Sequence, residues 1–433
     1  MDASPCYIPT IEATLELQFV VPQGPEDFHP EDERWFSLAE RQKQGDEDHV
    51  VDPNPAVFAK LKHIFQKEII GLALKTPADR RHGAASAQRT TWGLFHDNCR
   101  SQEPSSWSVG PCPSATSEVA SGPLRVFDVY DWAGVKLVGN RIVSDDLDGA
   151  DLGVICVALR REMRLQINKT CSFRVTVSSD APDGLDFDTI KKTLLLIWLT
   201  EPLLFDLCAP HRRQDAHCGM ITQSSLLTVD GPGGWVGNII DTEHLVRLVP
   251  DGGKLPQKSV NAMRKICQAP DVATLDTLLC DPRSFNTLSI GLGIGHYGRH
   301  DIQFNMHEGT LDHTTVKIWT RVCMAIVEKS SGDDDEFRGL LQRIADQIHT
   351  DGVVYDWRDL LVDLDVDSSV TFGFMKKRLL LERLDGGLPE SDDDASDLTL
   401  EENSPFLPDM ADDCNRIASA VPVLPQIYSL SLE

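Results

Sequence analysis

The sequence predicts an α+β fold in which helices flank an antiparallel sheet. Three observations support this prediction. Segments that alternate apolar and polar residues, as half-buried strands do, occur in the N-terminal, middle and C-terminal parts of the chain. Segments with apolar residues at helical spacing lie between them, but the two kinds do not alternate strictly, as a doubly wound parallel sheet requires. Hydrophobic residues make up 41% of the 433 residues, which is enough for a large core.

The N-terminal part predicts one strand and one helix. Residues 11–21, IEATLELQFVV, alternate as a strand does. Residues 24–53 are rich in Pro and acidic residues, which indicates an exposed insertion. Asn54 and Pro55 are typical of a helix start, and the apolar residues that follow them predict a helix over roughly 55–75.

The next part predicts short strands around an irregular segment. Residues 91–95 indicate a strand that ends near Asp97, and residues 124–143 predict a hairpin or a pair of strands. Between them, residues 101–123 are rich in Ser and Pro, which predicts a loose loop. Apolar stripes further along predict helices at 151–163, 187–208, 241–249, 258–268, 271–280, 335–350 and 370–384, and alternation predicts strands at 171–178 and 288–294.

The segment with the most information about function is residues 302–319, IQFNMHEGTLDHTTVKIW. Residues 302–306 alternate as a half-buried strand, and His307 to Thr310 then make a polar turn. Asp312 opens a helix over 313–329, because Asp is a preferred N-cap residue. A strand that passes through a polar turn into an amphipathic helix is a common place for a binding site.

These elements divide the chain into segments of different character. The segments are the first strand of the fold at 1–23, the insertion at 24–53, an α+β domain at 54–384 that contains the loop at 101–123, and an acidic tail at 385–433. From Asp385 to Asp413 the tail carries many Asp and Glu residues and no Lys or Arg, which predicts a solvated, disordered segment.

Charge and cysteine usage exclude several classes of partner and location. The formal net charge of −26 argues against nucleic acid and anionic membranes as main partners, because phosphate binding needs clustered Lys and Arg. The longest apolar run, 193–208, is interrupted by Glu201 and Pro202 and is too short to span a bilayer. The N-terminus lacks the basic and apolar regions of a secretory signal, and the 11 cysteines are scattered. These features predict a cytoplasmic protein with reduced thiols.

Six segments have sequences similar to motifs of one enzyme family, and they occur in the same order along the chain. Residues 302–319 match the pattern EFR…H-x-GTLD…W, with Gln303 and Asn305 at its Glu and Arg positions. The others are Thr14–Phe19 against G-x-E-x-E-F, Trp92–Cys99 against W…D-x-S, Trp132–Asn140 against W-x-G-V-E-L-V-S-P, Cys171–Val177 against C-G-F-H-V-H-V, and Ala209–Cys218 against P-x-R-R…Y-C. The chain therefore resembles the amidoligase family, a branch of the glutamine-synthetase and glutamate–cysteine-ligase superfamily that is widespread in filamentous fungi.

The resemblance implies a fold and a reaction. The antiparallel sheet would form a funnel like that of glutamine synthetase, flanked by helices. The reaction would be ATP- and Mg²⁺-dependent amide-bond formation between a carboxylate and an amine, on a small metabolite or an amino acid. In it, ATP phosphorylates the carboxylate and the amine then displaces phosphate. Mg²⁺ prefers carboxylate oxygen, and Arg binds phosphate through charge and fork geometry.

The resemblance also implies candidate site residues. Glu16 and Gln18 are the candidate metal ligands. The candidate catalytic residues are His307, Glu308 and Arg174. The candidate substrate or nucleotide contacts are Gln303, Asn305, Thr176, Asp97 and Arg212.

Each strand residue of this set also has a purely structural interpretation. The period of two places Glu16 with Gln18, and Arg174 with Thr176, on one face of their strands. In the family that face lines the active-site funnel. The alternative is that each pair lies on a solvated sheet face with no role in binding.

The remaining candidates also have a structural interpretation besides the functional one. His307 and Glu308 form either an acid–base or substrate-binding pair, or a structural pair in which the His binds a backbone carbonyl and the Glu caps the turn. Arg212, inside the basic run His211-Arg212-Arg213, either meets an anionic substrate or caps a helix C-terminus, where positive charge is favoured.

Several polar positions depart from the family pattern. Gln18, Lys136 and Gln303 replace Glu, Arg174 and Thr176 replace His, and Asn305 replaces Arg. Replacing Glu by Gln removes a charge and weakens Mg²⁺ binding, and Lys136 would repel the metal. Two functions follow. The first is a ligase that uses ATP and Mg²⁺ with small carboxylate and amine substrates. The alternative is a pseudoenzyme that acts as a binding or regulatory protein, with the acidic tail as a site for a protein partner.

Overall fold

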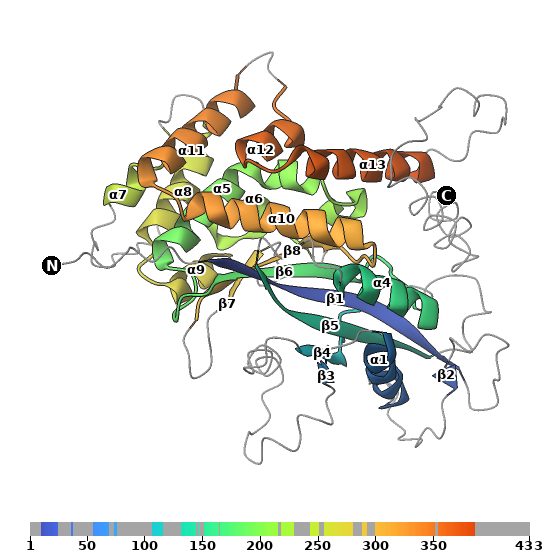
Figure 1. The fold of residues 1–433 in the computed structure, drawn as a ribbon. Helices are drawn as coiled ribbons and strands as arrows, with labels where there is room; N and C mark the ends of the chain where they lie inside the picture. The colour runs from blue at the N-terminus through green and yellow to red at the C-terminus, as the bar shows by residue number, and fades with distance from the viewer. Residues whose placement is uncertain are drawn as a thin grey trace, which may run out of the picture. The chain divides into compact units, whose positions relative to one another are not determined.

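An eight-stranded sheet is the centre of the fold in the computed structural model (Figure 1). The strands are β1 (Ile11–Gly24), β2 (Phe36–Ser37), β3 (Ala73–Lys75), β4 (Ser106–Pro111), β5 (Asp131–Val143), β6 (Ser172–Ser179), β7 (Leu288–Gly291) and β8 (Asp301–Glu308). Their order is β3-β4-β5-β1-β6-β8-β7, with β2 paired to β1 off this path. Every neighbouring pair on the path is antiparallel except β3 with β4. The predicted α+β class with an antiparallel sheet is confirmed.

The structure describes only part of the chain. The described residues are 10–24, 36–37, 55–68, 73–75, 106–115, 131–143, 147, 151–163, 165–214, 218–228, 243–250, 255–279, 288–291, 299–350 and 354–385. The chain divides into two compact units, Met1–Gly373 and Phe374–Glu433. The sheet and the candidate site residues that the structure describes all belong to the first unit.

The apolar face of the sheet forms the core. On the central strand β1, the side chains of Leu15, Leu17 and Phe19 are fully buried. The register places Leu17 opposite Leu137 of β5 and Phe173 of β6, so that one apolar row crosses three strands. Because successive side chains point to opposite faces, the polar residues between these positions lie on the other face.

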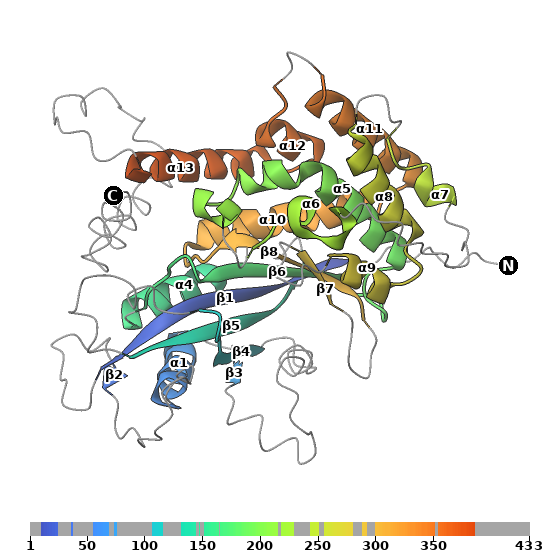
Figure 2. The same cartoon turned by 180° about the vertical axis from the view of Figure 1, so that it is seen from behind.

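Helices cover the apolar face. The helices that the structure describes are α1 (Pro55–Glu68), α4 (Asp151–Glu162), α5 (Phe187–Phe205), α6 (Ile221–Ser224), α7 (Glu243–Val246), α8 (Gln257–Gln268), α9 (Val272–Leu279), α10 (His313–Ser330), α11 (Asp334–Ile348), α12 (Trp357–Asp363) and α13 (Ser368–Asp385), with 3₁₀ turns η4 (Pro210–Gln214) and η5 (Leu226–Thr228), and only some of them contact the sheet. α10 packs on β1 and β6, and α5 lies beside α10 (Figure 2). At the other end of the sheet, Phe65 of α1 meets Trp107 of β4 with ring centroids 6.2 Å apart.

Local signals position the helix that follows β8. Asp312 is its N-cap and accepts hydrogen bonds from the backbone N–H groups of Thr314 at 3.3 Å and Thr315 at 3.0 Å, as the sequence predicts. Within the described residues, no helix is long and apolar enough to cross a membrane.

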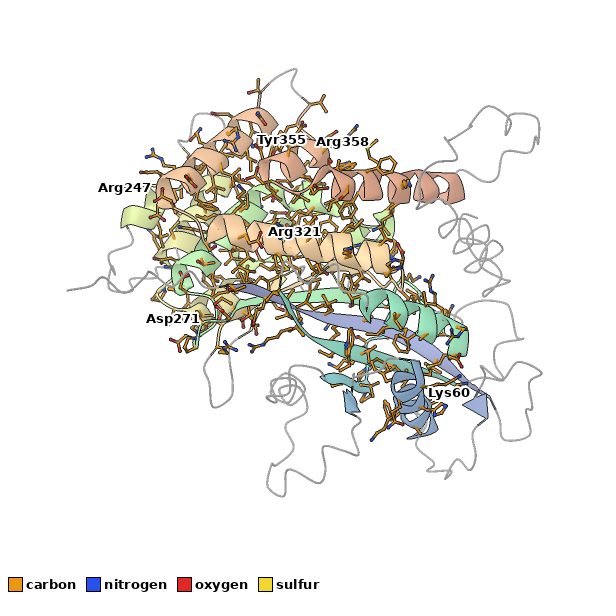
Figure 3. All side chains as sticks on the ribbon, in the orientation of Figure 1. Lys60, Arg247, Asp271, Arg321, Tyr355 and Arg358 are labelled. Atoms are coloured by element: carbon orange, nitrogen blue, oxygen red, sulfur yellow. The ribbon has the colours of Figure 1, made fainter. Side chains whose placement is uncertain are left out.

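Polar contacts between helices complete the packing of the first unit. Glu201 of α5 is fully buried and accepts hydrogen bonds from the backbone N–H groups of Ile221 and Thr222, both at 2.9 Å. Near α12, where Figure 3 labels Tyr355, the hydroxyl of this residue donates to Asp363 at 2.8 Å. Asp363 also pairs with Arg343 of α11. Burial and the neighbouring carboxylate raise the pKa of Tyr355, so that its hydroxyl stays protonated and remains a donor.

Three predictions of local structure are wrong. The loop predicted over 101–123 contains β4, because Trp107 and Val109 supply buried side chains that pair and pack with β5. The helix predicted over 55–75 ends at Glu68, and Ala73–Lys75 form β3. His307 and Glu308, predicted in a turn, continue strand β8. Tertiary pairing overrides the local composition in each case.

Other predictions fall outside the described residues. These are the strand at 91–95 with Asp97, most of the insertion at 24–53, the first part of the strand pair at 124–143, and the acidic tail after 385. The boundary between the two compact units falls inside α13, before the predicted domain limit at 384.

We expect Gly134→Ala to lower the free energy of unfolding by about 1–3 kcal/mol, because overpacking carries a cost of that order. A Cβ at Gly134 of β5 would lie 2.1 Å from the carbonyl oxygen of Cys112 and 2.2 Å from that of Ala115, where the chain after β4 crosses β5. The matched control is Gly339→Ala inside α11, where a Cβ meets nothing within 4 Å.

The control variant should be more stable than the wild type by about 0.5–1 kcal/mol, because Ala is the better helix former. Urea unfolding followed by circular dichroism measures both variants. Equal stability of the two variants would contradict the close crossing over Gly134.

Candidate functional site

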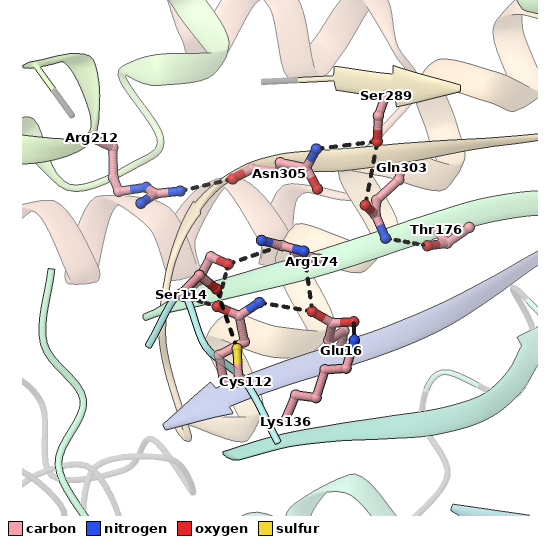
Figure 4. A network of polar contacts seen from close by, with 12 residues as sticks. Glu16, Cys112, Ser114, Lys136, Arg174, Thr176, Arg212, Ser289, Gln303 and Asn305 are labelled. Carbon is pink, nitrogen blue, oxygen red and sulfur yellow. Dashed lines mark hydrogen bonds and ion pairs between the residues drawn. The ribbon is translucent and has the colours of Figure 1, made fainter. Parts of the chain in front are cut away.

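A row of polar side chains runs across five strands on the face of the sheet opposite the core (Figure 4). The residues are Lys136 from β5, Glu16 and Gln18 from β1, Ser172, Arg174 and Thr176 from β6, Gln303 and Asn305 from β8, and Ser289 from β7. The register makes many of them direct cross-strand partners: Lys136 with Gln18, Glu16 with Arg174, Thr176 with Gln303, and Gln303 with Ser289. The structure thus brings together six of the ten candidate residues.

The first half of this row is a charged cluster around Glu16. Glu16 Oε1 accepts a hydrogen bond from Gln18 Nε2 at 2.7 Å and lies 3.4 Å from Arg174 Nη1. Its other oxygen, Oε2, lies 3.5 Å from Lys136 Nζ. The Glu16 residue is only 7% exposed, so solvent screens these contacts weakly. One buried carboxylate is therefore held between two cations.

The amide of Gln18 is fully used within the same cluster. Gln18 is 2% exposed, and its Oε1 accepts from both the backbone N–H of Ser172 at 3.1 Å and the Ser172 hydroxyl at 2.8 Å. The Ser172 hydroxyl in turn accepts from Arg174 Nε at 3.1 Å. These bonds orient the guanidinium of Arg174 as well as the carboxylate of Glu16.

This cluster does not fit Mg²⁺. Mg²⁺ requires near-octahedral oxygen ligands, usually with one or two carboxylates. Both Glu16 oxygens face cations, the Gln18 amide oxygen is bonded to Ser172, and the three charged side chains sum to +1. Two unit charges 4 Å apart interact by about 4 kcal/mol at a protein surface, so Lys136 and Arg174 would each repel a metal here strongly. Across the described residues, no group of three or more His, Cys, Asp or Glu side chains is arranged to hold a metal ion.

The second half of the row is a neutral cluster of amides and hydroxyls. Gln303 Nε2 donates to the Thr176 hydroxyl at 3.2 Å. The Ser289 hydroxyl donates to Gln303 Oε1 at 3.3 Å and accepts from Asn305 Nδ2 at 3.3 Å. Gln303 is nearly buried, and the other three are half-buried. This cluster offers hydrogen bonds without a formal charge.

A small apolar group closes one end of the polar face. Val20, Cys112, Ala115 and Cys171 pack together there, and the Cys112 thiol lies 3.3 Å from the Ser114 hydroxyl. Burial raises the pKa of the Cys112 thiol, and the negative charge of Glu16 adds to the effect. Cys112 is therefore a neutral thiol at physiological pH and a poor nucleophile.

His307 lies apart from this cluster, and Glu308, although opposite Ser172 in the register, directs its carboxylate toward Ala209 and His307. A bulge in the β6–β8 pairing places His307 opposite Phe173, on the apolar face, although Gln303 lies opposite Thr176 on the polar face. The His307 side chain is fully buried, and its ring centroid lies 5.8 Å from that of Phe173 and 5.2 Å from that of Trp319. The structure therefore does not bring His307 to Arg174.

The hydrogen bond of His307 matches its structural interpretation, whereas Glu308 caps a segment other than the turn that follows it. His307 Nδ1 donates to the carbonyl oxygen of Glu308 at 2.8 Å. Glu308 Oε2 accepts from the backbone N–H of Ala209 at 2.8 Å, which ties the end of β8 to the segment after α5. Both side chains hold the backbone in place.

Arg212 has a similar position. It lies in η4, is 2% exposed, and donates from Nη2 to the carbonyl oxygen of Asn305 at 2.8 Å and from Nε to that of Met306 at 3.2 Å. These two carbonyls belong to the bulged part of β8, where ladder bonds are interrupted. Arg212 thus stabilises the strand that carries Gln303 and Asn305.

Sequence reasoning did not find four of the residues around the site. Ser172 and Ser289 lie at period-two positions of predicted strands, so alternation carries a signal for them. Cys112 and Ser114 follow β4 inside the segment predicted as a loop, where the sequence carries no such signal.

Comparison with known proteins places the chain in no known group. No protein-family model matches it, and neither a curated protein nor a solved structure is a match.

We expect Glu16→Gln to lower the free energy of unfolding by about 1–2 kcal/mol, because it leaves the cations of Lys136 and Arg174 close together without their carboxylate. The cost is smaller than that of a fully buried unpaired charge, because solvent reaches both cations in part. The side chains of Lys136 and Arg174 are 19% and 26% exposed. Glu12→Gln is the matched control, because Glu12 pairs with the exposed Arg141 at the far end of β1.

The control should cost less than about 1 kcal/mol, as exposed ion pairs do. Urea unfolding at low and high salt separates the two variants, since salt screens the exposed pair more. A cost for Glu16→Gln no larger than that of Glu12→Gln would contradict the central place of Glu16.

For Arg212→Gln we expect a loss of about 2–4 kcal/mol, because two buried carbonyl oxygens lose charge-assisted hydrogen bonds. Arg213→Gln is the control on the next residue, where the guanidinium is exposed and pairs with Asp206. It should change stability by less than about 1 kcal/mol. Thermal unfolding measures both, and a null result for Arg212→Gln would argue that its guanidinium is available to a ligand instead.

Proposed function

We propose that this chain is an amidoligase-like protein whose polar sheet face binds a small anionic ligand without Mg²⁺, as a binding or regulatory pseudoenzyme. The observation that carries this proposal is the placement of Glu16 between Lys136 and Arg174 at 3.5 and 3.4 Å. Because two cations compensate the charge of Glu16, this carboxylate attracts a metal ion only weakly. The three side chains together carry one excess positive charge.

Arg174 is the residue that we propose contacts the ligand. Its Nε is bonded to Ser172 and its Nη1 pairs with Glu16, whereas Nη2 has no partner among the described residues. The side chain is 26% exposed. A guanidinium with an open edge binds carboxylate or phosphate oxygens well, and its bonds to Ser172 and Glu16 reduce the entropy lost on binding.

We also propose that the polar face lines a glutamine-synthetase-like funnel. The arrangement that supports this is an antiparallel sheet with helices packed on its apolar face and candidate binding residues on the other. Binding, rather than chemistry, is favoured because Glu16 is paired, His307 is buried on the opposite face and Cys112 is a neutral thiol. A cytoplasmic location and an acidic tail that binds a protein partner stay predictions.

The second candidate function is the ligase itself. Glu16 and Arg174 are cross-strand partners on the polar face, which is the arrangement that the resemblance implies for a metal ligand beside a phosphate or carboxylate contact. In that case ATP, a carboxylate and an amine would be the substrates. Mg²⁺ would then have to displace Lys136 or Arg174 from Glu16, which the charges oppose.

Thermal unfolding with and without ligands separates the two functions, because a ligand that binds only the native state raises the melting temperature. We expect at least one anion among phosphate, citrate, gluconate and ATP, each at millimolar concentration with EDTA, to raise it. The shift should disappear in Arg174→Gln and persist in Arg213→Gln. No shift with any of these anions would overturn the proposal. A shift that requires both ATP and Mg²⁺ and is lost in Glu16→Gln would establish the ligase instead.

A further inference from the structure

We infer that the ligand of this face is a polyhydroxy carboxylate, such as a sugar acid, that carries no ammonium group; this inference rests on the proposed function. It follows from the two halves of the polar row. One half is charged and has an open guanidinium edge at Arg174, and the other half is neutral. A single small molecule that spans both halves needs one anionic end and one uncharged polar end.

The spacing of the two halves sets the size of the ligand. Arg174 and Thr176 lie two residues apart on β6 and point to the same face. Two residues of an antiparallel strand span about 7 Å. The hydroxyl of Thr176 is the nearest member of the neutral cluster, and Gln303 and Ser289 continue it across β8 and β7. Because the guanidinium of Arg174 is bonded to Ser172, on the side away from Thr176, a ligand whose carboxylate binds Arg174 must extend at least about 7 Å to reach Thr176 and Gln303, which corresponds to a chain of at least roughly five or six carbon atoms.

The chemistry of the neutral half selects hydroxyl groups. The side chains of Gln303 and Asn305 each carry both a donor and an acceptor, and the hydroxyls of Thr176 and Ser289 can act as either. A ligand hydroxyl is also both donor and acceptor, so it can replace any bond in this cluster without leaving a buried group unsatisfied. A second ligand carboxylate finds no cation among the four side chains of this cluster to compensate its charge.

The charge balance of the first half excludes an ammonium group. Glu16, the carboxylate nearest to Arg174, is already held by Lys136 and Arg174. Three further carboxylates lie toward the ends of their strands. Glu12 pairs with Arg141, and Asp301 is buried with contacts of its own. Glu308, opposite Ser172, accepts a hydrogen bond from the backbone N–H of Ala209 and lies 3.7 Å from His307 Nε2. An ammonium at the Arg174 end would meet two cations and no available anion. The site should therefore favour hydroxy acids over amino acids of the same length.

The test is isothermal titration of the full chain, in EDTA, with D-gluconate and three matched probes. Propionate keeps the carboxylate without hydroxyls, glucose keeps the hydroxyls without the carboxylate, and 2-amino-2-deoxy-D-gluconate replaces one hydroxyl by an ammonium. We expect gluconate to bind at least about tenfold more tightly than each probe, since the loss of two hydrogen bonds or of one charge contact is of that order.

Two variants connect the preference to the structure. Ser289→Ala and Gln303→Leu should each reduce the preference for gluconate over propionate by about three- to tenfold, with propionate affinity unchanged, because each removes members of the neutral cluster only. Arg174→Gln should abolish binding of both acids. Ser289→Ala removes a half-buried hydroxyl and serves if Gln303→Leu does not fold.

The possible failures are distinguishable. If propionate or the amino analogue binds as tightly as gluconate, and Arg174→Gln still abolishes binding, the sugar-acid inference is overturned while the proposed anion site stands. If none of the acids binds but phosphate, citrate or ATP raises the melting temperature without Mg²⁺, the sugar-acid inference fails while the proposed anion site stands; if none of these anions does so either, the proposed function itself is overturned. If gluconate binds but the preference is unchanged in both Ser289→Ala and Gln303→Leu, the neutral cluster is not part of the site and the inference fails.

Discussion

The alternation of side chains along β1 is the constraint on which the structure depends. β1 is the central strand, paired on one side with β5 and on the other with β6. Leu15, Leu17 and Phe19 bury one face against α10, and this burial determines the register of both neighbouring strands. A slip of one residue would put Glu16 and Gln18 into the core. The hydrophobic effect that forms the core thereby also places the polar residues together on the other face.

Charge compensation on that face decides what it can bind. Lys136 and Arg174 come from the two strands that flank β1, so both reach the same carboxylate of Glu16. A buried carboxylate is stable only with charged or hydrogen-bonding partners. Lys136 and Arg174 are those partners for Glu16, and they oppose the binding of a metal ion there. What remains available is positive charge at Arg174 and a neutral hydrogen-bonding surface beside it. The same residues that stabilise the sheet are thus the basis of the proposed preference for anions.

The bulge in β8 places two polar residues that are close in the sequence, Gln303 and His307, on opposite faces of the sheet. Gln303 lies on the polar face, but four residues later His307 points into the core against Trp319. Arg212 holds the two carbonyl groups at the bulge. Without this irregularity, strict alternation would place His307 on the same face as Gln303. A local interruption of strand pairing therefore removes the only described histidine of β8 from the polar surface.

The sequence by itself determined the α+β class, most of the long helices and strands, the N-cap at Asp312, and the shared faces of Glu16 with Gln18 and of Arg174 with Thr176. These features follow from periodicity and capping, which are properties of neighbouring residues. Only the tertiary structure decided that β4 joins the sheet, that His307 is buried, and that Lys136 and Arg174 both hold Glu16. Strand pairing, bulges and charge partners depend on contacts between segments far apart in the chain, and no local pattern specifies them.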